Sequence, residues 1–173
     1  MKKIIYISIF LLTSISYAQT LDLNLTKFAG NWEYNNGTET FKVELFIEQD
    51  YDNDGYHLSG DYQLINNTTG EVIYQSNKTV TNDGTSLTLE KEIFLKVSGN
   101  NLVSGSVQDN VLYDGTGNSG TGTLLCNLAI EIQDSCNTCP TTATWKAKRV
   151  SGVHVGEITT PNIPTDIILT KTD

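Results

Sequence analysis

Apolar and polar residues alternate along most of this chain, and that period of two constrains its fold more than any other feature. In residues 40–49 every second position is apolar, beginning at Phe41 and ending at Ile47. The same alternation recurs in four further segments, residues 56–65, 93–97, 124–132 and 143–148. One apolar side per strand is typical of an antiparallel sheet with one dry face. The sequence therefore predicts an all-β protein.

Short clusters of Gly, Asn and Asp separate these segments. Asn53-Asp54-Gly55 and Asn82-Asp83-Gly84 are examples, and such residues tolerate the positive φ that tight hairpins need. No window carries a helical stripe, so we expect at most a turn or two of helix near residues 23–28. Strands with turns at roughly 8–12-residue spacing are typical of barrels and sandwiches. We therefore predict an antiparallel up-and-down β-barrel, with a sandwich as the alternative, in a single domain over residues 19–173.

Residues 1–18 have the features of an export signal. Two lysines precede an apolar stretch over residues 4–15, and Ser16-Tyr17-Ala18 then places small residues at a cleavage site. This order is typical of a secretory signal peptide, and the apolar stretch is short for a bilayer span. A retained anchor helix is the alternative. We expect export to the periplasm or out of the cell. No later segment approaches the ~20 apolar residues of a membrane helix, so we expect no transmembrane segment in the mature chain.

The chain is acidic, with 20 Asp and Glu residues against 11 Lys and Arg residues and a net charge of −9. A nucleic-acid binder needs a basic face to replace the counterions on phosphates, so we expect no nucleic-acid partner. The sequence has two histidines and neither a nucleophile elbow nor an H-E-x-x-H motif. Its carboxylate pairs are what an acidic surface produces by chance. We therefore expect no catalytic residues and a protein that is not an enzyme, with an unrecognised hydrolase as an alternative.

One acidic segment matches the start of a calcium loop. Asp50, Asp52 and Asp54 alternate before Gly55, and Asp61 stands at the twelfth position. Carboxylates at alternate positions can converge on one hard cation where a glycine allows a sharp turn. The flanking segments have the pattern of strands rather than helices, however, and Asp61 is shorter than the usual Glu. The segment is therefore either a calcium site, the one cofactor that the sequence suggests, or a solvated hairpin turn.

The three cysteines are Cys126, Cys136 and Cys139. An exported protein oxidises its cysteines where geometry permits. If residues 124–132 pair with residues 143–150, Cys126 lies roughly 20 Å from the connecting loop, at ~3.3 Å per residue. A disulfide needs Cα atoms within ~7 Å of each other. We therefore predict a Cys136–Cys139 disulfide that closes the loop and leaves Cys126 as a buried thiol.

Residues 23–34 read LNLTKFAGNWEY. They resemble the first motif of the lipocalins, in which a short 3₁₀ turn leads into Gly-x-Trp on the first barrel strand. The resemblance implies that Gly30 permits a close backbone approach and that Trp32 plugs the barrel floor. It also implies that a basic residue from a late strand stacks on the tryptophan. Arg149 or Lys171 fits that role, and the structural residues that we name are Gly30, Trp32 and Arg149.

A second resemblance covers most of the mature chain. The residues that carry it are Phe41-x-Val43, the segment from Tyr56 to Tyr62, Trp145-Lys146-Ala147-Lys148 and the segment from Ile163 to Lys171. They are similar to a family of small secreted bacterial β-proteins described only as a domain of unknown function. The resemblance implies a lipocalin-like fold and no activity, cofactor or catalytic residue.

Two functions fit these observations. The first is an exported lipocalin-like protein that binds a small apolar ligand inside its barrel, since pockets form in the mouths of barrels. The second is a cell-envelope interaction or structural module with a filled core, which contacts an envelope protein through its acidic outer face and exposed apolar residues. An open interior cavity above ~300 Å³ favours the first function, and a packed interior favours the second. The residues expected to be exposed are Phe46, Ile65, Ile73 and Phe94. The side chains expected to point inward are Phe41, Val43, Leu45, Leu58, Tyr62, Ile93, Leu95 and Leu128.

Overall fold

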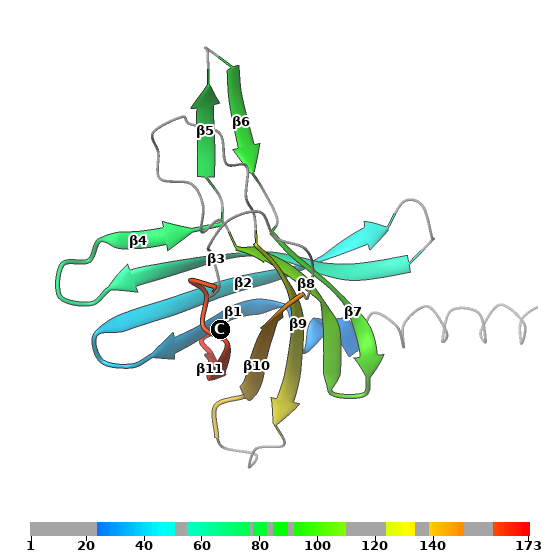
Figure 1. Ribbon diagram of the computed structural model, residues 1–173. Helices are drawn as coiled ribbons and strands as arrows, with labels where there is room; N and C mark the ends of the chain where they lie inside the picture. Colours follow the sequence, from blue (N-terminus) through cyan, green and yellow to red (C-terminus); the bar gives the residue numbers. More distant parts are fainter. Residues whose placement is uncertain are drawn as a thin grey trace, which may run out of the picture.

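The computed structural model describes residues 24–50, 55–76, 78–82, 85–89, 92–109, 124–133, 139–150 and 161–173. These residues are nearly all β (Figure 1). Eight of their strands close into an antiparallel barrel, a ninth pairs with the end of one of these, and two more form a separate hairpin. The prediction of a β-barrel is therefore confirmed, and the sandwich alternative is not the fold. Within these ranges no helix is long and apolar enough to cross a membrane.

The barrel follows the order of the chain around its wall. Neighbouring strands pair with each other, β3 pairs with β7, and β11 pairs with β1 to close the ring. This is the up-and-down order that the alternating pattern predicts. The barrel strands are β1 (Gly30–Asn35), β2 (Glu39–Asp50), β3 (Gly55–Asn66), β7 (Ile93–Gly99), β8 (Leu102–Asp109), β9 (Leu124–Gln133), β10 (Thr142–Arg149) and β11 (Asp166–Lys171).

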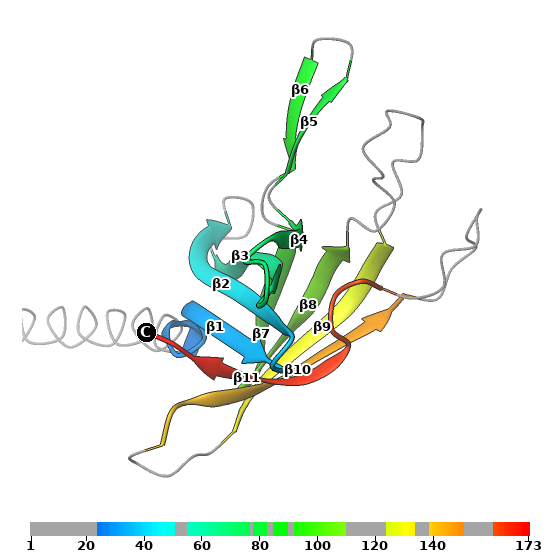
Figure 2. The same cartoon turned by 90° about the vertical axis from the view of Figure 1, so that its left-hand side faces the viewer.

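The chain between β3 and β7 adds strands outside the ring. β4 (Val72–Gln75) pairs with the later part of β3, whereas β7 pairs with its earlier part. β5 (Lys78–Asn82) and β6 (Thr85–Leu89) form a two-stranded sheet that projects from the barrel (Figure 2). The β3 strand therefore changes partner along its length, and it leaves β7 near Gly60.

Two glycines allow the wall strands to approach closely. A Cβ atom on Gly60 would overlap the backbone oxygen of Glu44 on β2, and one on Gly105 would overlap the backbone oxygen of Phe94 on β7. Glycine inside a strand often marks a tight bend where another backbone comes close. Any side chain at either position would push the strands of the wall apart.

A short helical turn, residues 24–26, closes one end of the barrel, as expected near residues 23–28. We call this end the floor. The side chains of Leu25 and Phe28 are buried there, and the Trp32 ring is 1 % exposed in the same cluster. The indole N–H of Trp32 donates to the backbone oxygen of Phe28 at 2.7 Å. The polar atom of this large ring is therefore satisfied although the ring is buried.

Side chains of the described strands fill the interior above the floor. All of the side chains expected to point inward are buried, at 0 % to 3 % exposed. The centre of the Phe41 ring lies 5.4 Å from that of Trp145, edge to face, and 5.9 Å from that of Tyr62. Aromatic pairs of this geometry stabilise a core beyond the area that they bury. The predicted inward face is therefore confirmed.

The strap, residues 161–165, covers the other end of the barrel. The Ile163 side chain is 2 % exposed and belongs to the core. The indole N–H of Trp145 donates to the backbone oxygen of Pro164 at 2.8 Å, and the Tyr74 hydroxyl donates to the backbone oxygen of Asn162. The chain itself thus covers the interior at both ends.

Candidate functional site

The basic residue that stacks on Trp32 is Lys171. Its ammonium group lies 5.6 Å from the centre of the Trp32 ring, because β1 and β11 pair with these two residues opposite each other. The same ammonium group donates to the backbone oxygen of Lys27 at 3.3 Å. Arg149, named above for this structural role, lies instead at the end of β10 opposite Cys126. The assignment of Arg149 is therefore corrected to Lys171, whose charge over the indole face stabilises the floor.

Gly30 brings the C-terminal residue against β1. Its φ of +117° is a conformation that favours glycine, and a Cβ atom there would lie 2.6 Å from the Oδ1 atom of Asp173. The backbone N–H of Asn31 donates to the two carboxylate oxygens of Asp173 at 3.0 and 3.1 Å. This donation lowers the pKa of the Asp173 carboxyl below its usual range. Gly30 therefore does permit a close approach, and the group that approaches is a carboxylate.

The predicted calcium residues do not all lie together. The β2–β3 register places Asp50 opposite Gly55, and Asp61 follows six residues further along β3. Since a strand rises about 3.4 Å per residue, Asp61 is about 20 Å away, and including it was wrong. Asp52 and Asp54 lie outside the described residues, as does the side chain of Asp50, so a site made by these three stays a prediction. Among the residues that are described, no group of three or more His, Cys, Asp or Glu could hold a metal ion.

Cys126 is a buried free cysteine on the inner face of β9. The pairing of β9 with β10, on which the disulfide prediction depends, is confirmed. Burial raises the pKa of the Cys126 thiol, and so does the nearby Asp109, whereas Arg149 lowers it. Cys136 lies outside the described residues, so the Cys136–Cys139 disulfide stays a prediction.

A groove of about 410 Å³ lies on the outer wall of the barrel, over β1, β2 and β3. We call it the outer groove. Its polar side chains alternate with the buried ones along each strand and therefore point outward. Gln75 of β4 borders it on one side, and Thr172 and Asp173 border it on the other. The outward residues that line it are Asn31, Glu33, Lys42, Glu44, Asp61 and Gln63.

Negative charge exceeds positive charge in the outer groove. Its side chains form two rows across the strands. The first row consists of Asp173, Asn31, Glu44 and Asp61. The second row consists of Glu33, Lys42, Gln63 and Gln75. In the first row Glu44 stands directly opposite Asp61. Like charges at directly opposite positions destabilise a strand pair. In the second row Lys42 stands between Glu33 and Gln63. The first row is therefore the one that favours a cationic partner.

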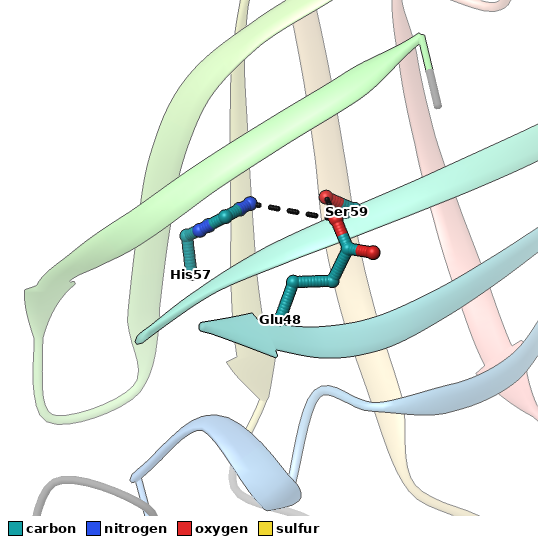
Figure 3. Close-up of polar contacts among 3 residues, drawn as sticks. All are labelled: Glu48, His57 and Ser59. Atoms are coloured by element: carbon teal, nitrogen blue, oxygen red, sulfur yellow. Dashed lines mark hydrogen bonds and ion pairs between the residues drawn. The ribbon is translucent and has the colours of Figure 1, made fainter. Parts of the chain in front are cut away.

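A second polar cluster lies on the outer wall, where β2 and β3 run toward their connecting turn (Figure 3). The Oε2 atom of Glu48 is 3.7 Å from Nε2 of His57, and the Ser59 hydroxyl donates to that same oxygen at 2.7 Å. In a catalytic triad the imidazole accepts the proton of the nucleophile. Here the glutamate accepts it, and Ser59 is only 3 % exposed. The three residues therefore lack the order that activates a serine.

The expected apolar surface residues differ in exposure. Ile73 and Phe94 are 48 % and 40 % exposed, as predicted, whereas Phe46 and Ile65 are half-buried, so that prediction was wrong for them. The centre of the Phe94 ring lies 4.6 Å from that of His57, and the Lys96 ammonium lies 5.4 Å from it. The Phe94 ring is thus in contact with polar groups and is not an open apolar surface.

The outer groove is not evident from the sequence. Its residues lie on the polar sides of separate strands, where acidic residues are ordinary surface groups. The hairpin of β2 and β3 is the one local signal, since its register brings Glu44 opposite Asp61. The two borders depend on where Gln75 and Asp173 lie, and these positions follow from long-range pairing.

Comparison with known proteins adds a family and no relative of established activity. A family model described as a family of unknown function (DUF6705) matches residues 1–172. No curated protein and no solved structure matches the chain.

Proposed function

The chain belongs to a family of unknown function (DUF6705), and from its geometry we propose an exported, non-enzymatic β-barrel module that binds a partner on its outer wall. The binding site is the outer groove. The observation that carries this proposal is an open volume of about 410 Å³ on the outer wall, while buried side chains fill the described interior. A pocket that holds a ligand is a concave site with a few convergent polar groups, and the outer groove has that form.

The packed interior supports this function over binding of a small apolar ligand inside the barrel. Phe41 contacts both Tyr62 and Trp145 across the interior. The floor and the strap bury further apolar side chains at the two ends. An internal ligand would have to displace these groups, and removing large side chains from a packed core costs several kcal/mol. The interaction module with a filled core is thus the better supported of the two functions.

The chemistry of the outer groove favours a partner with basic groups, such as a lysine- or arginine-containing segment of an envelope protein. Asp61 already accepts a hydrogen bond from the Ser76 hydroxyl at 3.0 Å, and a basic side chain between Glu44 and Asp61 would add charge-assisted hydrogen bonds and offset the two like charges at this register position. The side-chain amides of Gln63 and Gln75 can bond the polar backbone of such a segment. Because these groups stand on paired strands, they need little rearrangement to bind.

Titration of the mature protein with tetralysine tests this function. In the double variant Glu44→Gln/Asp61→Asn, tetralysine should bind at least about tenfold more weakly, a typical loss when charge complementarity is removed. Added salt should weaken binding to the wild type in the same direction. Glu131→Gln is the matched control, because Glu131 is an exposed carboxylate on β9, across the ring from β2. The Glu131→Gln variant should bind tetralysine with the affinity of the wild type.

A fluorescent fatty acid serves as the competing probe. Equal tetralysine binding by the wild type and the double variant would reject the outer groove. Fatty-acid binding that shifts the indole NMR signal of Trp145 would support an internal ligand instead. The two probes therefore distinguish the two functions in one set of samples.

Export is a separate part of the proposal, supported by the order of charged, apolar and small residues in 1–18. Peptide mass analysis of the protein recovered outside the cytoplasm of its own host should find Gln19 at the N-terminus. Recovery with Met1 still present would contradict cleavage after Ala18.

A further inference from the structure

Asp109 connects the wall of the barrel to the strap. It is the last residue of β8, and it is 1 % exposed. Its Oδ2 atom accepts the backbone N–H of Asn162 at 2.5 Å and that of Ile163 at 3.3 Å. The side chain of Ile163 is itself buried in the core. One carboxyl oxygen thus holds the strap in the place where it covers the barrel.

The second oxygen of Asp109, Oδ1, is buried and has no hydrogen-bond partner in the part of the chain that the structure describes. Burial disfavours the charged form of a carboxyl, and here the two backbone donors at Oδ2 leave Oδ1 without compensation. Protonation at Oδ1 removes the charge and leaves Oδ2 free to accept both backbone bonds. The neutral acid therefore keeps both bonds to the strap. The ionised form also keeps them, but it must hold a negative charge in a buried place.

Two titratable groups of the described residues lie near Asp109, and both stay protonated at neutral pH. Tyr74 on β4 is one of them, and burial, Asp109 and Glu39 all raise the pKa of its hydroxyl. Cys126 on β9 is another, with its thiol pKa raised by burial and by Asp109 and lowered by Arg149. Neither group therefore changes charge where a carboxyl with a raised pKa titrates.

We propose that Asp109 and the strap form a proton-controlled closure of this end of the barrel. With Asp109 protonated, the strap is held over the core. With Asp109 ionised, opening becomes easier, because lifting the strap lets water reach both carboxyl oxygens. Opening also uncovers Ile163 and frees the indole of Trp145 from Pro164, so the interior becomes accessible from this end.

The direction of the pH effect follows from the burial of Asp109. Burial raises the pKa of its carboxyl, and this outweighs the two backbone donors of Asn162 and Ile163, which lower it. The folded-state pKa thus lies above the unfolded value of about 3.9. The stability contributed by the protonated acid is complete below that value and is lost as pH rises through the folded-state pKa. Closure is therefore firmest in acid and loosens toward neutral pH.

Amide hydrogen exchange of the mature protein, measured by NMR, tests this closure. From about pH 4 to about pH 8 the protection of the Asn162 and Ile163 amides, corrected for intrinsic exchange, should fall in the wild type, by about tenfold for each unit by which the folded-state pKa of Asp109 exceeds the unfolded one. Asp109→Asn is a neutral and nearly isosteric mimic of the acid, and its protection should stay constant. Asp166→Asn removes an exposed carboxylate next to the strap and should behave as the wild type.

The carboxyl carbon signals of the wild type give an independent measurement. Asp109 should titrate above the ordinary range of aspartate. Glu92 is also buried, and its backbone oxygen accepts the N–H of Gln108, the residue before Asp109, so its carboxyl is followed in the same spectra. Equal pH dependence of protection in the wild type and Asp109→Asn would overturn the closure. So would an ordinary or lowered Asp109 pKa, a result that decides the matter even if the variant fails to fold. Neither outcome affects tetralysine binding at the outer groove.

Discussion

The two ends of the barrel are closed in different ways. At the floor, Trp32 and Phe28 are joined by a bond between an indole and a backbone oxygen, and Lys171 covers the ring from outside. At the strap end, a buried carboxyl of Asp109 holds the chain, and one of its oxygens has no partner among the described residues. Both ends bury a large apolar side chain, but the titratable group at the strap end is a buried carboxyl, whereas Lys171 and Asp173 at the floor are half-buried and exposed, respectively.

This difference separates a fixed closure from an adjustable one. The Trp32–Phe28 bond of the floor is local in sequence, because both residues lie on β1 or directly before it, whereas Lys171 and Asp173 reach the floor from the other end of the chain. The strap lies between β10 and β11 and is held by groups from β4, β8 and β10. Ionisation of the buried Asp109 weakens one of these contacts, and local opening has a lower free energy where a segment is held less firmly. The strap is therefore the end expected to open first.

Replacement of Trp32 by alanine should have the largest effect. Trp32→Ala removes a fully buried ring and its bond to Phe28, and such substitutions cost about 3–5 kcal/mol. Since domains hold only about 5–15 kcal/mol in all, the variant should be close to unfolding. Urea melts of the variant and the wild type measure this directly. A midpoint unchanged within error would show that the floor does not depend on Trp32.

Replacement of Ile163 by alanine should cost less, and it should act locally. Replacing a core isoleucine by alanine costs about 2–5 kcal/mol, and the low end is expected because a strap can move to fill the space. Hydrogen exchange should therefore rise mainly at the strap, while the amides of β1 keep their protection. A uniform loss of protection over the barrel would mean that the two ends open together.

Asp109→Asn should stabilise the protein at neutral pH and lose this advantage in acid. The difference in unfolding free energy at pH 7 should be about 1.4 kcal/mol for each unit by which the folded-state pKa of Asp109 exceeds the unfolded one. Asp173, whose pKa is lowered, contributes the opposite pH dependence, but it does so in both proteins and cancels in the comparison. Urea melts at several pH values measure the difference. A wild type that is more stable than the variant at pH 7 would contradict the adjustable closure.

Lys171→Met should have the smallest effect. The substitution removes the cation from the Trp32 ring and the bond to Lys27 but keeps most of the apolar stem. Cation–π contacts at accessible sites are worth about 0.5–1 kcal/mol. Arg149→Met is the matched control, because Arg149 lies on β10 away from that ring. Equal shifts in the two urea midpoints would show that the charge over Trp32 does not stabilise the floor.

The fold was predictable because its information is local. Alternation over residues 40–49 and 124–132 identifies strands and their inner faces without knowledge of any partner. The choice between Arg149 and Lys171 was not predictable, since it depends on which strand closes the ring against β1. The placement of Asp61 in the calcium site failed for a related reason. The calcium-loop motif assumes that its first and twelfth residues lie close together, but here the twelfth residue lies far along β3 from the turn. The outer groove depends both on which strands are neighbours and on their register, so it was not predictable either.

Closure of the ring by β1 and β11 has a consequence for the order of folding. This seam joins residues near opposite ends of the described chain, with Trp32 opposite Lys171 and Glu33 opposite Thr170. Contacts between distant parts of a chain form slowly, because the entropy of closing a long loop must be overcome first. The hairpins along the wall should therefore assemble before the seam, with φ-values that are high in the β2–β3 hairpin and near zero in β11. Until the seam forms, β1 and β11 each expose an unpaired edge.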